Sequence, residues 1–196
     1  MHVVARRQSA PPNEAVPQPD GLGAPLAEIY VQHAVLVFRG LRRLGVPQAC
    51  LEDAVQDVFL IAHRRGSEFE GRSSLSTWLY GVVVRVAKDY RRSEACRAKR
   101  ASVLECSLRG ELLISESPAD EAERRQANQL LHALLDSLPE QQRELLVLAA
   151  LEQLPLKEVA QVLGLRIRTC QRRLQAAHEA FERALSRFMA KGARQA

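Results

Sequence analysis

The residues best suited to chemistry lie in one segment, residues 69–92. Aromatic side chains stand at its start and cationic side chains accumulate at its end: Phe69, Trp78, Tyr80, Arg85, Lys88, Arg91 and Arg92. Aromatic rings beside a cationic helix face suit stacking on unpaired bases while arginines hold the phosphates. A helix that only fills a core would explain Trp78 and Leu79, but not the Gly/Ser-rich approach or the arginines at the exit. The segment therefore predicts a contact with unpaired nucleic acid.

A second candidate site lies in residues 155–174, whose pattern fits a helix-turn-helix. Val159 and Leu163 are expected to be buried, and Gly164 supplies the turn, which needs unusual backbone freedom. The second helix is expected to direct polar side chains toward base edges and phosphates of a major groove. These are Arg168, Thr169, Gln171, Arg172 and Gln175. An ordinary helical hairpin with a solvated basic face is the alternative interpretation.

The charge distribution supports two contacts with one nucleic acid. The net charge is +5, and residues 85–100 hold seven Lys/Arg against two Asp/Glu. Residues 166–187 hold six basic residues against two acidic ones, whereas residues 105–123 hold one Arg against six acidic residues. Two basic regions separated by an acidic spacer are typical of a protein that contacts nucleic acid at two places.

Other chemistries find little support. Asp53 and Asp57 stand at i, i+4 spacing, which is compatible with paired carboxylates for acid–base chemistry or metal binding. However, the sequence places no His, Cys or nucleophilic Ser with them. The four cysteines form no C-x-x-C pair, so we interpret them as reduced, structural thiols. The longest apolar run, residues 145–151, is too short to cross a bilayer, and residues 1–21 lack a signal-peptide core. We expect a cytoplasmic, non-catalytic protein without metal or cofactor and without membrane insertion.

The elements that must position these sites are all predicted to be helical. Residues 1–25 hold five of the nine prolines and no apolar period, which favours a disordered leader. Three helices are expected in residues 26–97, over about 26–44, 47–65 and 75–97. Residues 98–124 are interpreted as a flexible acidic linker. Helices over 129–135 and 140–151 then begin a second domain, residues 125–190, which carries the helix-turn-helix. The fold class is all-α, with two small helical domains and no strand signal.

Three blocks of the sequence resemble one known family. The sequences Trp78-Leu79-Tyr80 and Asp89-Tyr90-Arg91-Arg92 are similar to the promoter-melting segment of extracytoplasmic function (ECF) sigma factors of bacterial RNA polymerase, in the sigma-70 family. Residues 53–59 resemble the helix with which these proteins bind the polymerase clamp, and residues 138–174 resemble their second DNA-binding domain. The blocks occur in family order and at family spacing over about two thirds of the chain.

The resemblance implies a role for each block. The clamp-binding residues would be Asp53, Gln56, Asp57 and Phe59. A loop from Phe69 to Thr77 would capture a flipped base of the −10 element, with Trp78 and Tyr80 supporting the pocket or stacking at its edge. The residues for −10 binding and melting would be Phe69, Arg72, Ser74, Thr77, Trp78, Tyr80, Arg85, Lys88 and Arg92. The −35 duplex would be read by Arg166, Arg168, Thr169, Gln171, Arg172, Arg173 and Gln175.

The implied partners are core RNA polymerase, promoter DNA (duplex at −35, single-stranded at −10) and an anti-sigma factor. The chain departs from the family pattern at Arg85, where Asn is preferred, and at Ala176-Ala177-His178, where Arg-Ala-Arg is usual. Two other readings stay open: a stand-alone helix-turn-helix regulator, and a degenerate sigma-like interaction protein. Residues 53–59 and 78–80 argue against the first, because a simple repressor has no use for them.

Overall fold

The chain folds into two helical regions, described in a computed structural model over residues 26–93 and 118–192. The first region contains α1 (Leu26–Arg43), the 3-10 turn η1 (Gln48–Cys50), α2 (Leu51–Arg64), the 3-10 turn η2 (Gly66–Glu68) and α3 (Leu75–Arg92). The second contains α5 (Pro118–Asp136), α6 (Glu140–Leu146), the π turn η4 (Val147–Leu151), α7 (Leu156–Val162) and α8 (Ile167–Gly192). No strand occurs in either described range. The predicted all-α class is confirmed.

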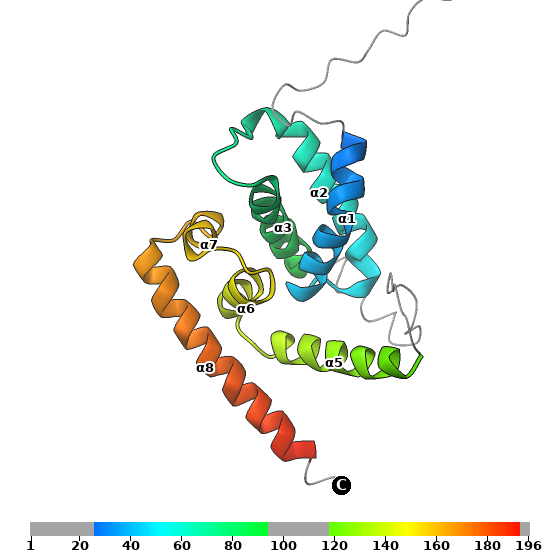
Figure 1. Ribbon diagram of the computed structural model, residues 1–196, viewed down its shortest axis with the longest axis vertical. Helices are drawn as coiled ribbons and strands as arrows, with labels where there is room; N and C mark the ends of the chain where they lie inside the picture. The colour runs from blue at the N-terminus through cyan, green and yellow to red at the C-terminus, as the bar shows by residue number, and fades with distance from the viewer. Residues whose placement is uncertain (1–25, 94–117, 193–196) are drawn as a thin grey trace, which may run out of the picture.

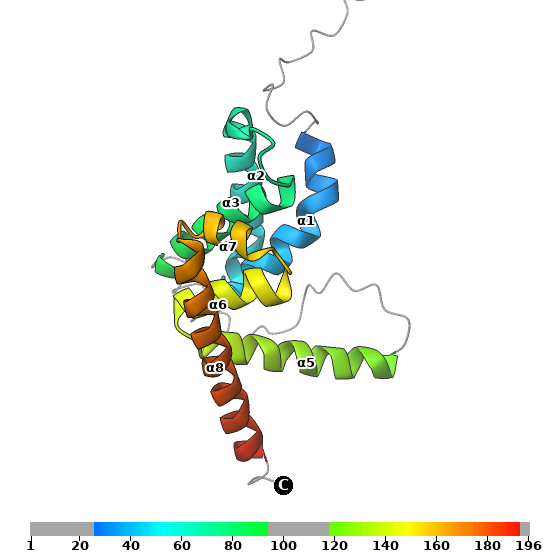
Figure 2. The same ribbon diagram turned by 60° about the vertical axis from the view of Figure 1, so that its left-hand side comes forward.

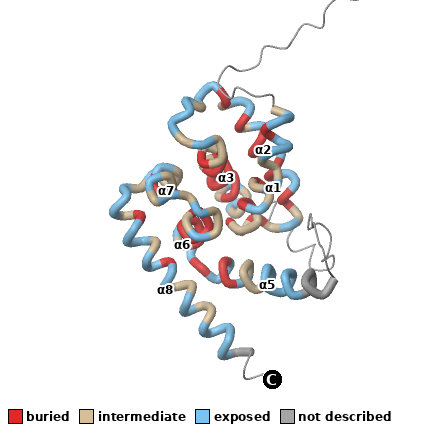
Figure 3. Tube along the Cα trace, in the orientation of Figure 1, coloured by how far each residue is buried: buried red, intermediate tan, exposed pale blue. Residues whose placement is uncertain are grey.

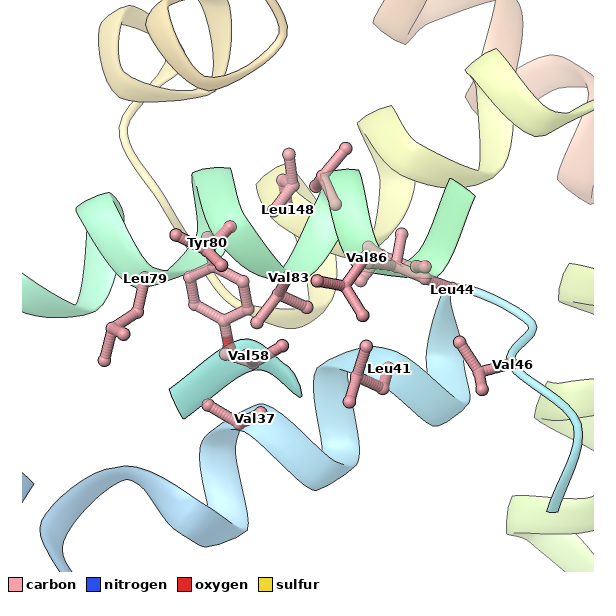
Figure 4. Close-up of a cluster of buried hydrophobic side chains, with 14 of the residues drawn as sticks. Val37, Leu41, Leu44, Val46, Val58, Leu79, Tyr80, Val83, Val86 and Leu148 are labelled. Carbon is pink, nitrogen blue, oxygen red and sulfur yellow. The ribbon is translucent and has the colours of Figure 1, made fainter. Parts of the chain in front are cut away.

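The first region is a three-helix bundle in which α1, α2 and α3 all contact one another (Figure 1). Its core interleaves the apolar faces of the three helices, with Val37, Leu41, Val58 and Val83 fully buried (Figure 4). The turn after α1 runs through Gly45 at φ 89°, a left-handed conformation that glycine adopts without steric cost. At the start of α3 the Ser74 hydroxyl accepts the Thr77 N–H at 3.1 Å, which caps the helix.

The helix-turn-helix is present as predicted from residues 155–174. The turn between α7 and α8 passes through Gly164 at φ 63°, and the Leu165 N–H donates to the Ala160 carbonyl at 2.8 Å. Val159, Ala160 and Cys170 are buried between the two helices. Leu163, predicted to be buried, is partly exposed. Beyond the turn, α8 continues for 26 residues, and its C-terminal half extends away from the rest of the molecule (Figures 1 and 2).

The two regions pack directly against each other. Helix α7 contacts α3, and both views place α6 and α7 alongside α3 (Figures 1 and 2). The buried side chains of both regions join one cluster, in which Leu148 of η4 lies with Tyr80, Val83 and Val86 of α3 (Figure 4). In Figure 3 the buried positions of α6 lie on the side where the two regions meet. The sequence predicts two domains on a flexible linker, and it contains no sign of this shared core.

Some predicted boundaries differ from the observed ones. Helix α5 begins at Pro118, inside the segment interpreted as linker, and extends well beyond the predicted 129–135. The expected helix 140–151 changes from α to π geometry after Leu146. The leader, residues 1–25, and most of the predicted linker lie outside the described residues. Cys50 is disulfide-bonded and Cys170 is a free, buried thiol, so the interpretation of four reduced thiols is wrong at Cys50.

Candidate nucleic-acid interface

The predicted −10 residues of α3 fall on two adjacent faces of the helix. Trp78, Arg85 and Arg92 stand seven residues apart, so they share one face, and Arg85 and Arg92 are exposed there. Thr77, Tyr80, Lys88 and Arg91 are separated by three, eight and three residues, so they lie on the neighbouring face. That second face is turned toward α6, η4 and α7, because all four of its side chains bond to glutamates of these elements or their connections. The structure therefore leaves one predicted face open and covers the other.

The covered face is closed by Glu144, Glu152 and Glu158, which we call the interdomain glutamates. The Tyr80 hydroxyl, in a side chain that is only 1% exposed, donates to Glu152 Oε2 at 2.5 Å. Burial first, and then the bond to Glu152, raise the pKa of Tyr80 above its ordinary value. Tyr80 is therefore a neutral donor inside the molecule. In this arrangement it supports its neighbours and cannot stack on a base.

The open face ends in an aromatic pair at the start of α3. The rings of Phe69 and Trp78 meet edge to face with their centroids 5.7 Å apart, a favoured geometry for aromatic pairs. Both side chains are half-buried, so each keeps an accessible surface. Ser74 is exposed at the helix cap, and the exposed Arg72 pairs with Glu70 in the same loop. The loop that was predicted from sequence thus presents aromatic and cationic groups together.

The predicted clamp-binding residues on α2 separate into surface and core. Asp53 and Gln56 are exposed on one side of the helix. Asp57 is half-buried and accepts a hydrogen bond from the Tyr90 hydroxyl at 2.6 Å. Phe59 is only 4% exposed and packs against Tyr30, with ring centroids 4.8 Å apart. The structure assigns Phe59 to the bundle core, where it orders α1 against α2, and not to a contact surface.

The predicted −35 residues gather at the start of α8. Six of the seven are exposed, and Thr169 is half-buried. Arg168, Arg172 and Gln175 are spaced three and four residues apart, so they project from one face of α8. Arg173 lies on the side nearer α6, where its guanidinium donates to the Gln141 side-chain oxygen at 3.5 Å. One polar row on the second helix of a helix-turn-helix is the arrangement that reads a major groove.

Sequence reasoning missed the functional importance of residues that join the two regions. The interdomain glutamates stand in ordinary amphipathic helices, and Arg39 and Arg43 look like solvated charges at the end of α1. A weak signal was available, because Glu152 stands between apolar residues 145–151 and 154–156, where a charged side chain needs a partner if it is buried. Its two arginine partners, however, lie more than a hundred positions away.

In the part of the chain that the structure describes, no three His, Cys, Asp or Glu side chains come together as metal ligands do. Across the same residues, no helix has the length and apolar character of a bilayer span.

Comparison with known proteins gives the family of this chain. Sigma-70 region 2 matches residues 29–96, which include all of the first bundle except the first three residues of α1, and sigma-70, region 4 matches residues 128–180, which include the helix-turn-helix. The ECF RNA polymerase sigma-E factor of Escherichia coli (strain K12) is 28% identical over 142 residues, which is 70% of this chain and 74% of that protein. The chain belongs to the ECF sigma factors of the sigma-70 family. The predicted family resemblance is confirmed.

Other ECF sigma factors extend the comparison. The sigma-E factor of Haemophilus influenzae is 26% identical over 161 residues, 80% of this sigma factor and 82% of that one. Among solved structures, CnrH, in complex with the cytosolic domain of CnrY, matches with a TM-score of 0.58 and 22% identity, over 82% of this chain and 87% of CnrH. The Bartonella quintana sigma factor RpoE, in complex with the anti-sigma factor NepR, matches with a TM-score of 0.53 and 21% identity. The match covers 81% of this chain and 98% of RpoE. At these identities the two structures support the fold alone.

Proposed function

We propose that this sigma factor binds core RNA polymerase, recognises the −35 and −10 elements of promoters and promotes DNA melting at transcription initiation. The observation that carries the proposal is the presence of two different nucleic-acid chemistries in one chain. The Phe69–Trp78 pair beside a basic helix suits single-stranded DNA, and the polar row of α8 suits a duplex. A stand-alone helix-turn-helix regulator needs only the second.

The −35 element is proposed to be read by the N-terminal turns of α8. Arg168 and Arg172 can each make bidentate bonds to a guanine edge or hold a phosphate, and Gln175 suits an adenine edge. Helix α7 then crosses the backbone, as the first helix of such motifs does. The exposure of this row in the free protein supports the proposal, because none of these three side chains must leave a buried position to reach DNA.

The −10 element is proposed to be captured as a single strand at the start of α3. Extruding a base costs a few kcal/mol, which stacking and a fitted pocket must offset. Stacking on an aromatic ring contributes about 1–3 kcal/mol per base, so the accessible surfaces of Phe69 and Trp78 are the right kind of support. Arg85 and Arg92 on the same face would hold the backbone, with Lys88 and Thr77 joining them once the covered face is free.

Core polymerase is proposed to bind the exposed side of α2 at Asp53 and Gln56. Asp57 borders this surface, and its bond with Tyr90 fixes the end of α3 against α2. Phe59 contributes by packing only. The sigma factor is proposed to act as a non-catalytic, cofactor-free subunit in the cytoplasm, where RNA polymerase is found. By analogy with the RpoE–NepR complex, we also propose that an anti-sigma factor binds it.

The test is run-off transcription with purified bacterial core polymerase and this sigma factor across a genomic fragment library. Discrete start sites that share two upstream elements at fixed spacing are expected. Core binding without transcripts would favour the degenerate sigma-like reading. Loss of core binding as well would leave only a duplex-binding regulator, which an electrophoretic mobility assay on the same library would detect.

A further inference from the structure

The contacts between the two regions point to an autoinhibited state. We propose that the interdomain glutamates hold the second helical region (region 4) on the first (region 2) and mask the covered face of α3 from the −10 strand. Promoter binding then requires the two regions to separate. This inference rests on the proposed role of α3 in −10 binding. It adds to that role a competition between carboxylates of this chain and phosphates of DNA for the same donors.

Glu152 is the most enclosed of the three acidic groups, with a side chain that is 3% exposed. Its carboxylate accepts from Arg43 at 2.6 Å, from Arg39 at 3.2 Å and from the Tyr80 hydroxyl at 2.5 Å. Three donors from two helices of region 2 thus converge on one anion of region 4. Arginine and hydroxyl donors arranged around an anion are also what a phosphate group requires.

Glu144 occupies a second position on the same face, with a side chain that is 4% exposed. One carboxylate oxygen lies 3.2 Å from Lys88 Nζ, and the other lies 3.2 Å from the Arg91 guanidinium. Glu140 adds a 2.7 Å pair with Arg91. Glu158 of α7 accepts from the Thr77 hydroxyl, at the N-terminal end of α3. Carboxylates therefore follow α3 from one end to the other, as a bound strand's phosphates would.

The backbone around Glu152 is distorted in a way that directs this side chain inward. The α-helical pattern gives way to a π turn at Val147–Leu151, and the Glu152 N–H donates to the Val147 carbonyl at 2.9 Å. The next residue, Gln153, has φ 54°, a left-handed conformation that costs a non-glycine residue free energy. Single π turns are frequent at functional positions. The π turn and the left-handed Gln153 together place Glu152 against region 2, which is consistent with a specific contact.

Two of the donors on region 2 remain reachable from solvent, which a competing ligand requires, whereas Tyr80 and Thr77 are buried. The Arg39 side chain is 48% exposed and that of Lys88 is 36% exposed, although the glutamates they bind are buried. A DNA phosphate can therefore approach these cations at the edge of the contact and replace the carboxylates one by one. A contact made only by buried donors would have to open completely before any exchange could begin.

Zero-length cross-linking of the unmodified protein with a carbodiimide tests the closed state. The reaction joins Lys88 to Glu144 as an amide only when the two groups are in contact, and peptide mass spectrometry identifies the product. We expect this cross-link in the free protein, and we expect its yield to fall when single-stranded DNA of mixed sequence is added to saturation. Absence of the cross-link overturns the closed state. A yield that saturating DNA leaves unchanged overturns the competition.

The variant Glu144→Gln/Glu152→Gln tests the role of the carboxylates, with Glu179→Gln/Glu182→Gln on the exposed part of α8 as the matched control. Circular dichroism checks that both remain helical, and the single variants replace the double variant if it does not. If the open form is about a tenth of the population, opening should tighten binding of fluorescein-labelled single-stranded DNA about tenfold. Small-angle scattering should show a larger radius of gyration for this variant alone.

The outcomes separate this inference from the proposed function. An unchanged radius and affinity in the double variant overturn the autoinhibition and leave the run-off result standing. An expanded variant with no gain in DNA affinity overturns the masking. If, in addition, transcripts are absent from the run-off assay, the proposed role of α3 fails as well.

Discussion

The guanidinium of Arg143 lies against the α-carbon of Gly45, so closely that a β-carbon at position 45 would stand 1.9 Å from Arg143 Nη1. Arg143 belongs to α6 and Gly45 to the turn after α1, so the contact joins the two regions. The Arg143 guanidinium donates to the carbonyls of Leu135, Asp136 and Leu138, and to that of Leu44 in region 2. It therefore terminates α5 and connects the regions with one side chain.

Gly45→Ala is expected to destabilise the protein by about 2–5 kcal/mol. A left-handed φ costs an L-residue roughly 1–2 kcal/mol, and displacing a charged donor from buried carbonyls adds about 1–3 kcal/mol. Urea unfolding measures the change. Gly71→Ala is the control, since Gly71 has φ 69° but open space around it. Equal losses in the two variants would show that the Arg143 contact contributes nothing beyond backbone strain.

Arg143→Met is expected to lower the free energy of unfolding by about 3–5 kcal/mol, the range for breaking a buried charged interaction. Methionine keeps the apolar stem but leaves the carbonyls at the end of α5 without their donor. Thermal unfolding followed by circular dichroism measures the effect. Arg183→Met removes an exposed i, i+4 pair with Glu179 instead, and a loss below about 1 kcal/mol is expected there. A similar small loss in Arg143→Met would contradict the structural role.

Acidification is expected to weaken the folded state through His132. Burial, with help from Arg42 and Arg43 of α1 and against the opposing effect of Asp136, lowers the pKa of His132 to about 4. Because the unfolded chain then binds this proton more readily, stability is complete above about pH 6.5 and decreases as the pH falls toward 4. Protonation also places a positive charge beside the two arginines of α1.

The measurement for His132 is urea unfolding at several pH values between 4 and 7.5. His132→Gln should flatten the pH dependence, whereas the exposed His63→Gln serves as the substitution control. Burial also lowers the pKa of His33, so part of the slope will remain in both variants. Identical slopes in His132→Gln and the unmodified protein would refute the assignment.

Trp78 is expected to report binding of single-stranded DNA by its fluorescence, since it is the one tryptophan of the chain. A base stacked on its indole should quench the emission, and duplex DNA lacking unpaired bases should quench it much less. Phe69→Leu removes an edge-to-face partner and should weaken strand binding by about 0.5–1.5 kcal/mol. Phe188→Leu, at the exposed end of α8, provides a control that should change nothing.

Arg172→Ala is expected to weaken binding to the −35 duplex by about 1–3 kcal/mol if the side chain reads a base. A phosphate contact would instead lower affinity for all duplexes evenly and reduce the salt slope by about 1. Fluorescence anisotropy at several salt concentrations distinguishes the two roles. Binding to core polymerase should be unchanged, and a loss of core binding would count against placing Arg172 in the DNA surface.

Local patterns were enough to predict the helices that carry the sites. Apolar residues at helical spacing identified α1, α2 and α3, and Gly164 with its neighbours identified the turn before α8. Exposed polar residues on the second helix of the motif, such as Arg168 and Arg172, could be assigned for the same reason. In each case the relevant interactions lie within a few residues along the chain, so the order of residue types carries the information.

Tertiary structure decided which faces are covered. Phe59 and Tyr80 were predicted as site residues, and only the packing of α1 on α2, and of Glu152 on Tyr80, places them inside. Periodicity shows that a helix face is apolar or charged but does not say which distant segment lies on it. Arg39 and Glu152 are 113 positions apart, and a salt bridge at that separation depends on how whole helices pack, which no local pattern encodes.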